Sequence, residues 1–159
     1  HLFKLVTQKW LANLFMFSEK APYGIKDERI RRFVLDTLQS DDRPVEEIFG
    51  RRGGVVLEFR WLVRETMRGI GGVKQPALIF PPRHDDQSDI SNTMLLQRKL
   101  GGLVETVVLE DSYHMVTLDR QRGLVIDRSA AFAGALDRQL QASAERTRER
   151  ERLRAKAVE

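Results

Sequence analysis

Two short apolar runs, each followed by a reactive polar residue, constrain the fold more than any other feature of the sequence. Residues 73–80 end in Ala-Leu-Ile-Phe and residues 104–109 are rich in β-branched side chains, so both runs are predicted to be strands. Asp85 follows the first run, His114 follows the second, and residues 91–100 between them have a helical pattern. Because parallel strands release their loops at one edge of a sheet, we expect Asp85 and His114 to lie together. The predicted fold class is α/β.

An aspartate beside a histidine is suited to acid–base catalysis. The imidazole can take a proton from a hydroxyl nucleophile and later give it to a leaving group, while the carboxylate fixes the tautomer of the ring. Such chemistry needs a third group, which is a serine or cysteine nucleophile. The chain has no cysteine, so a thiolate nucleophile and a disulfide scaffold are both excluded.

The first turn leaves the identity of the acid open between two neighbouring carboxylates. Pro81 and Pro82 are predicted to end the first strand abruptly, and this unusual pair leaves the position of the acid uncertain between Asp85 and Asp86. Asp85 is the first choice and Asp86 is the alternative. Asp89 is expected to cap the helix that follows.

The two turns also contain the residue types of a metal site. His84 is interpreted as a loop residue and not as the base, and the alternative for His114 is a hydrogen-bonded loop histidine without a catalytic role. A metal could accept the ligand types at His84, Asp85, Asp86 and His114, but no family spacing supports such a site. No cofactor is expected.

The same residues resemble the C-terminal half of an α/β-hydrolase. Residues 76–85 and 109–119 are similar to the last two core strands and turns of the carboxylesterase and monoacylglycerol-lipase branch, which is also filed with the serine aminopeptidase-like hydrolases. In that branch the histidine lies in a Ser-x-His-x-x-Thr-x-Asp run, which this chain matches at Ser112, His114, Thr117 and Asp119. Residues 22–30 also resemble the cap of bacterial members. The resemblance implies that Asp85 is the triad acid and His114 the triad base.

The resemblance also divides the chain into three parts. It implies a partial α/β-hydrolase with a helical cap at residues 1–72, the C-terminal part of the core at 73–140, and a charged helical tail at 141–159. Three helices are predicted before the first strand, at residues 2–17, 27–38 and 55–70, with a flexible loop at 50–54 and a short helix at 46–49. Aromatic and methionine side chains on these segments are interpreted as core, with lining of an acyl pocket as the alternative: Phe15, Phe17, Phe59, Trp61 and Met67.

The nucleophile elbow of that family does not occur in the sequence. The elbow is Gly-x-Ser-x-Gly and precedes the acid and the histidine in chain order. None of the serines has glycines at that spacing: Ser18, Ser40, Ser88, Ser91, Ser112, Ser129 and Ser143. We therefore expect the back half of a serine hydrolase of carboxylic esters, without the first strands, the oxyanion loop and the nucleophile. The chain alone is then expected to be inactive.

Two kinds of partner follow from this interpretation. The hydrolase needs an acyl ester substrate and the missing N-terminal half, supplied in cis or in trans. The alternative function is a non-catalytic, hydrolase-derived fragment that acts as a packing or binding module, with self-association as a homo-oligomer because its sheet edge and apolar surface are uncovered.

The composition is that of a globular protein with a mixed surface. Hydrophobic residues make up 42% of the chain, and 27 basic side chains stand against 23 acidic ones, for a net charge of +4. The sequence pattern has no basic face interleaved with aromatic residues, so a nucleic-acid partner is not expected. The absence of cysteine fits a reducing compartment, and we expect a cytoplasmic location.

The C-terminal segment is predicted to change character near residue 140. Residues 120–140 form a helix with an apolar face, and beyond them Ala, Arg and Glu dominate. Pairs such as Glu149 with Arg152 support a solvated helix. We interpret residues 141–159 as a frayed tail, with a role at a partner or membrane surface as the alternative.

Overall fold

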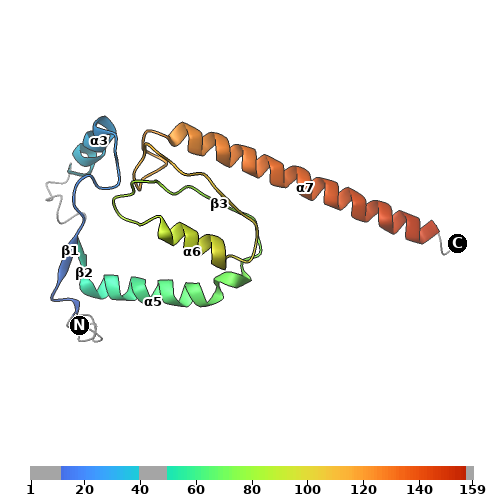
Figure 1. The fold of residues 1–159 in the computed structure, drawn as a ribbon, viewed down its shortest axis with the longest axis horizontal. Helices are drawn as coiled ribbons and strands as arrows, with labels where there is room; N and C mark the ends of the chain where they lie inside the picture. Colours follow the sequence, from blue (N-terminus) through green and yellow to red (C-terminus); the bar gives the residue numbers. More distant parts are fainter. Residues whose placement is uncertain (1–11, 40–49, 157–159) are drawn as a thin grey trace. The chain divides into compact units, whose positions relative to one another are not determined.

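The structure is a computed structural model that describes residues 12–39 and 50–156 (Figure 1). The described residues form a mixed α/β structure with two small sheets. In chain order the elements are β1 (Met16–Ser18), α3 (Glu28–Leu38), β2 (Gly50–Arg52), α5 (Gly53–Gly69), the 3₁₀ turn η2 (Ile70–Gly72), β3 (Ala77–Ile79), α6 (Ser91–Lys99), β4 (Val104–Thr106) and α7 (Arg122–Lys156). The chain divides into two compact units, of which the first ends at Gln121 and the second begins at Arg122.

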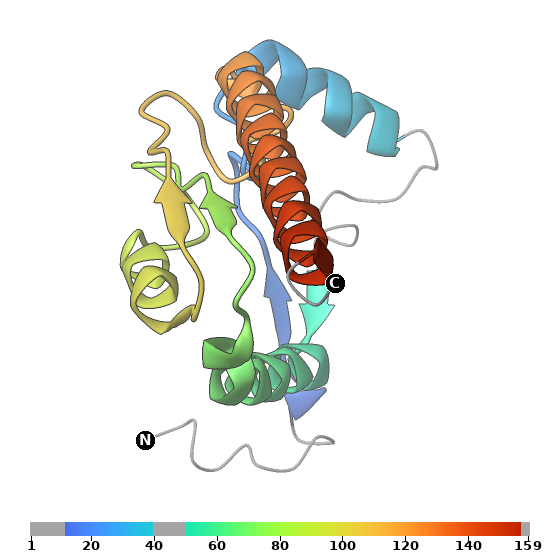
Figure 2. The same ribbon diagram turned by 90° about the vertical axis from the view of Figure 1, so that its right-hand side faces the viewer.

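The two predicted parallel strands are confirmed, although both are shorter than predicted. β3 pairs with β4 in parallel, with Ala77 opposite Val104 and Ile79 opposite Thr106. Figure 2 shows the two arrows, green for β3 and gold for β4, running in the same direction. Parallel strands need a crossover connection, and α6 supplies it between them.

β3 ends at Ile79, just before the two prolines that were predicted to end the strand, but backbone pairing with the neighbouring segment goes further. The pairing continues past both prolines, because Leu109 N–H donates to the Pro81 carbonyl at 2.9 Å and Arg83 N–H donates to the Leu109 carbonyl at 2.8 Å. Pro82 forms a parallel bridge with Leu109. A proline has no backbone N–H to donate, but its carbonyl can still accept a hydrogen bond. The two segments therefore stay paired here with fewer donors. As a result, the chain is held in register almost to the acid turn.

The predicted helix at residues 2–17 is wrong at its C-terminal end, and its residues 2–11 lie outside the described residues. Met16–Ser18 form β1, which pairs antiparallel with β2. The predicted flexible loop at 50–54 is also wrong, because it forms β2 and the first turn of α5. A side chain on Gly53 would collide with the carbonyl oxygen of Ala12, so the glycine permits close packing of two segments. Residues 16–18 and 50–52 are strands because they pair with each other across a long stretch of sequence. The predicted short helix at 46–49 lies outside the described residues.

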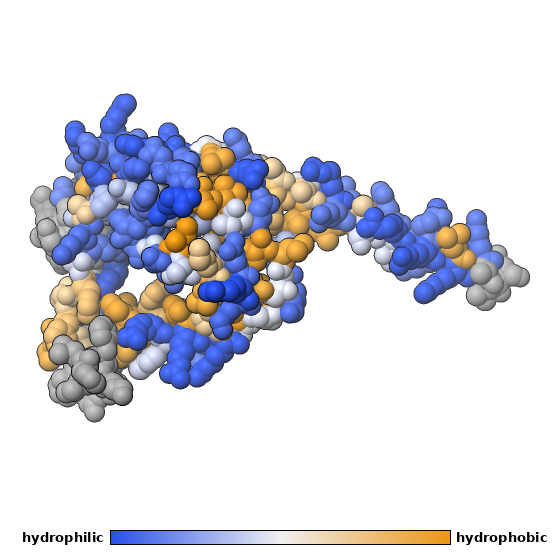
Figure 3. All heavy atoms as spheres, viewed as in Figure 1, coloured by the Kyte–Doolittle hydropathy of each residue, from blue (hydrophilic) through white to orange (hydrophobic). Residues whose placement is uncertain are grey.

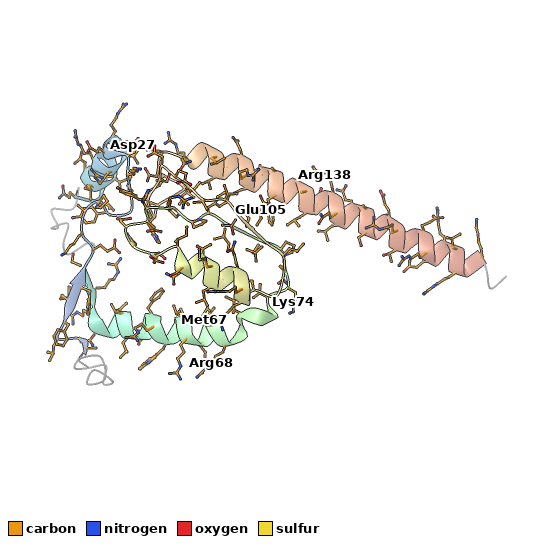
Figure 4. The ribbon with its side chains drawn as sticks, in the orientation of Figure 1. Asp27, Met67, Arg68, Lys74, Glu105 and Arg138 are labelled. Carbon is orange, nitrogen blue, oxygen red and sulfur yellow. The ribbon has the colours of Figure 1, made fainter. Side chains whose placement is uncertain are left out.

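The other two helices predicted before the first strand are confirmed. Asp27 caps α3, and its carboxylate accepts hydrogen bonds from Arg29 N–H at 2.9 Å and Ile30 N–H at 3.3 Å (Figure 4). α5 spans the predicted segment, with Met67 half-buried and Arg68 exposed and paired with Glu65 (Figure 4).

Much of the apolar surface predicted to be core is exposed. Phe59 and Leu62 on α5 are each 63% exposed, and Phe33 on α3 is 72% exposed. Phe15, Phe17 and Trp61 are also exposed, so the interpretation of these aromatic residues as core is wrong. Figure 3 shows hydrophobic side chains at the surface along β1 and α5. Apolar surface of this extent is typical of a site where another segment or molecule packs.

α7 forms the second unit by itself and is longer than the predicted helix. It runs without interruption from Arg122 to Lys156, so the segment predicted to be a frayed tail is helical up to residue 156. Strong helix formers fill its last turns, and Gln141 Nε2 donates to Asp137 Oδ2 at 2.8 Å across one turn. The local propensity of Ala, Arg and Glu is sufficient to explain the extension.

We expect Gly102→Ala to destabilise the first unit by about 1–3 kcal/mol, because a side chain there would collide with the backbone carbonyl oxygens of Lys74 and Gln75. Gly69→Ala is the matched control. No atom lies within 4 Å of a side chain built at Gly69, which has helical geometry, so alanine should be neutral or stabilising by about 0.4–1 kcal/mol. Urea denaturation of the full chain measures both. Equal stability of the two variants would contradict the close packing at Gly102.

Candidate acid–base site

The acid turn begins where the parallel ladder ends. Asp85 lies two residues beyond Arg83, and its side chain is only 7% exposed. Its Oδ1 accepts hydrogen bonds from Gln87 N–H at 2.8 Å and Ser88 N–H at 3.1 Å, which form an Asx turn. These two bonds fix the carboxylate on its own loop and leave Oδ2 directed to another partner.

That partner is His114. Its Nδ1 lies 3.0 Å from Asp85 Oδ2 and 3.2 Å from Oδ1, and the imidazole is 43% exposed. An ionised carboxylate can only accept, so Nδ1 is the protonated nitrogen of the neutral ring and Nε2 carries the lone pair. This is the tautomer that a general base needs in a Ser-His-Asp arrangement.

The structure thus brings together the two residues that the sequence placed on neighbouring strand ends. Asp86, the alternative acid, is occupied elsewhere: its Oδ2 accepts a hydrogen bond from Gly24 N–H at 2.8 Å. His84 is exposed, and it contributes to lowering the pKa of Glu110 after the hydrogen bond from Arg83, which is the largest cause. The geometry assigns the aspartate–histidine pair to Asp85, while the catalytic role of either residue stays a prediction.

A buried carboxylate organises the loop that carries the histidine. Asp119 is fully buried, and it accepts hydrogen bonds from the backbone N–H groups of Tyr113, Lys26, Asp27 and Arg120 at 2.7 to 2.9 Å. Burial by itself raises the pKa of Asp119, but the four N–H donors outweigh it and lower the pKa below the ordinary 3.8. The carboxylate therefore joins the histidine loop to the segment that starts α3.

The remaining residues of the Ser-x-His-x-x-Thr-x-Asp run divide into one buried and one exposed position. The Ser112 hydroxyl is buried and accepts a hydrogen bond from Gln121 N–H at 3.0 Å, which closes the loop around His114. Thr117 is exposed. The spacing of the run is thus explained by loop geometry, because its serine and aspartate bind backbone groups on either side of the histidine. The match to the run marked both Ser112 and Asp119 in the sequence, but it did not indicate the backbone groups that they bind.

Ion pairs connect the same loops at the surface. Glu110 forms a bidentate pair with Arg83, at 2.5 and 2.7 Å, across the ends of the two strands. This contact raises the pKa of Arg83 and lowers that of Glu110. Lys26 Nζ lies 2.7 Å from Asp111, which also binds Arg120 at 3.1 Å. Bidentate geometry gives orientation as well as attraction, although exposed pairs contribute little stability.

His114 borders two cavities. One has a volume of about 370 Å³ and is bounded mainly by α3 and the histidine loop. Its lining residues are Glu19, Tyr23, Ile25, Arg31, Val34, Leu35, Leu38, Arg51, Gln87, His114 and Met115. The other, of about 170 Å³, lies against the acid turn and includes Asp85 and Thr93. The larger cavity has a mostly apolar lining and a volume in the range of small-molecule sites.

Within residues 12–39 and 50–156, no group of three or more His, Cys, Asp or Glu side chains is arranged to hold a metal ion. No helix in the described part of the chain has the length and apolar character needed to cross a bilayer.

Comparison with known proteins adds no family to this picture. No protein-family model matches the chain, and no curated protein gives a significant match. The relation to α/β-hydrolases therefore remains a prediction from the residues.

The lowered pKa of Asp119 makes the stability of the first unit depend on pH. A carboxyl group whose pKa is lower in the folded state contributes stability that is complete above its unfolded pKa and is lost as the pH falls through the folded pKa. We expect Asp119→Asn to cost at least about 1–3 kcal/mol near pH 7. This difference from the unmodified chain should shrink below about pH 4.

Urea denaturation between pH 3 and pH 7 is the measurement, with Asp36→Asn on the exposed surface of α3 as the control for loss of one charge. A cost that stays constant through this range, or one equal to that of the control, would contradict the role given to Asp119.

Proposed function

We propose that the chain is part of a serine hydrolase of the α/β-hydrolase type that cleaves carboxylic esters, with Asp85 as the acid and His114 as the base. The observation that carries the proposal is the contact of 3.0 Å between His114 Nδ1 and the carboxylate of Asp85, whose side chain is 7% exposed, formed by the loops after two parallel strands. The order of acid before histidine along the chain is that of the α/β-hydrolase triad.

The reaction requires a serine hydroxyl from outside these 159 residues. His114 Nε2 accepts the hydroxyl proton while the serine oxygen forms a bond to the ester carbonyl carbon. The resulting imidazolium, stabilised by Asp85, gives that proton to the departing alkoxide and leaves an acyl-enzyme. Water then loses a proton to Nε2 and attacks the acyl carbon, and the serine is released with the proton returned to it.

The cavity of about 370 Å³ beside His114 supports an acyl substrate of moderate size. Its apolar wall is formed by Ile25, Val34, Leu35, Leu38 and Met115. An apolar chain bound there would lie beside the imidazole, with its carbonyl end toward the base. Burial of such a chain contributes about 0.8 kcal/mol per methylene group.

A second candidate function is a non-catalytic packing or binding module derived from a hydrolase. The observation that favours it is the exposed apolar surface on β1 and α5, which includes Phe59 and Leu62. In the described residues each sheet has two strands, so each strand also has an edge without a paired strand. Surfaces and edges of this kind promote association between copies of a chain.

The hydrolase proposal is tested by supplying the nucleophile-bearing half. The chain alone should neither hydrolyse p-nitrophenyl esters nor react with a fluorophosphonate probe. Co-expression with an α/β-hydrolase N-terminal half that carries the Gly-x-Ser-x-Gly elbow, in one chain or as a second one, should give both activities. His114→Gln and Asp85→Asn should each lower kcat by about 10²–10⁴.

The matched controls for this test are His84→Gln, which changes the exposed histidine that precedes the acid, and Asp36→Asn, which changes an exposed aspartate on α3. They should retain the full rate. A reconstituted enzyme that keeps its rate after His114→Gln would refute the assignment, as would a probe adduct on a serine of this chain.

The binding-module alternative is tested by the oligomeric state. It predicts that the chain sediments as a dimer or larger species at micromolar concentration and that Phe59→Ser with Leu62→Ser shifts it to a monomer, because both side chains are exposed on α5. Ile126→Ser on α7 is a control of similar exposure and chemistry. A monomer before substitution would count against this alternative.

A further inference from the structure

We propose that Gly24 and Asp86 are positioning residues for His114, in which Asp86 holds the Gly24 backbone and Gly24 supports the histidine side chain from behind. The proposal deepens the proposed function, because positioning of His114 has a catalytic consequence only if His114 is the base. The geometry on which it rests does not depend on that function.

Gly24 lies directly against the histidine. It is buried and has φ of +75°, which is the left-handed region that glycine adopts without strain. A side chain built there would lie 3.1 Å from His114 Cβ and 3.0 Å from Met115 Cγ. Only a glycine lets the backbone approach the base of the histidine side chain so closely.

Both backbone polar groups of Gly24 are bound to the two loops of the site. Its N–H donates to Asp86 Oδ2 at 2.8 Å, which ties it to the acid turn. Its carbonyl accepts from Met115 N–H at 2.8 Å, which ties it to the histidine loop. Gly24 therefore connects the loop that carries the acid to the loop that carries the base.

These contacts form a closed ring. Asp85 binds His114, Met115 follows His114 and binds Gly24, and Gly24 binds Asp86, which follows Asp85. Two of these hydrogen bonds, Met115 N–H to the Gly24 carbonyl and Gly24 N–H to Asp86, join the backbone of the histidine loop to the acid turn, so a separation of the two loops must lengthen at least one of them. Asp86 is thus placed to fix the position of the loop that carries the base.

A carboxylate at residue 86 is a stronger acceptor for a backbone N–H than a neutral group, because charge-assisted hydrogen bonds are shorter and roughly twice as strong. Asparagine keeps an acceptor oxygen in the same place, whereas alanine removes it. The pair Asp86→Asn and Asp86→Ala therefore separates loss of the hydrogen bond from loss of the charge.

The test is ¹⁵N NMR of the full chain labelled at histidine. The chain has three histidines, so His84→Gln and His114→Gln complete the assignment. We expect the His114 ring to be protonated at Nδ1 in the unmodified chain. Asp86→Ala should shift the ratio of the two tautomers toward Nε2–H by about fivefold, the effect of one net hydrogen bond. Asp86→Asn should restore most of the original ratio.

Gly24→Ala is the second variant and should perturb the His114 signals at least as strongly as Asp86→Ala, while Asp89→Ala in the same loop should leave them unchanged. An Asp86→Ala spectrum identical to that of the unmodified chain would overturn the proposal. An equal effect of Asp86→Asn and Asp86→Ala would also overturn it, because charge and not the hydrogen bond would then be responsible.

The reconstituted hydrolase separates this proposal from the proposed function. If both hold, Asp86→Ala lowers kcat with little change in KM, and Asp86→Asn recovers most of the rate. A spectroscopic effect in an assembly with no esterase activity would refute the hydrolase and leave the positioning intact. Activity that depends on His114 together with an unchanged spectrum in Asp86→Ala would refute the positioning alone.

Discussion

The parallel backbone ladder between residues 77–83 and 103–109 is the constraint on which the candidate site depends. Its hydrogen bonds run from Ala77 to Arg83, so the chain leaves the ladder two residues before Asp85. Leu109 is fully buried at the corresponding end of the other strand. Because the two loops start side by side at fixed positions, few additional contacts are needed to bring a carboxylate and an imidazole within 3.0 Å.

The additional contacts that fix these loops are hydrogen bonds from backbone N–H groups to aspartate carboxylates. Asp85 binds its own turn, Asp86 binds Gly24, and Asp119 binds four N–H groups from two segments. A charged acceptor on a backbone donor is a strong and directional contact. The aspartates thus act as loop anchors.

The pairing of Asp85 with His114 could be predicted from the sequence because it follows from strand order and from the behaviour of parallel sheets. Strand order alone does not distinguish Asp85, the first choice, from Asp86, since both carboxylates occupy the same turn and the contact that engages Asp86 comes from Gly24, 62 residues away along the chain. The strand at Met16–Ser18 and the pairing beyond Pro81 were missed for the same reason. Each depends on a partner distant in sequence, and local propensity carries no information about it.

The candidate site is packed around buried polar side chains, whereas large apolar side chains elsewhere are exposed. The fully buried side chains of the described residues include Ser112 and Asp119 as well as Leu109, whereas Phe59, Leu62 and Phe33 face solvent. The geometry around His114 is therefore held by hydrogen bonds within three loops and not by a large apolar core. Such an arrangement can keep its internal distances while the apolar surface on β1 and α5 is covered or uncovered, because none of the ring contacts around His114 uses a residue of that surface. The proposed association through that surface and the proposed acid–base chemistry at His114 therefore do not depend on the same residues.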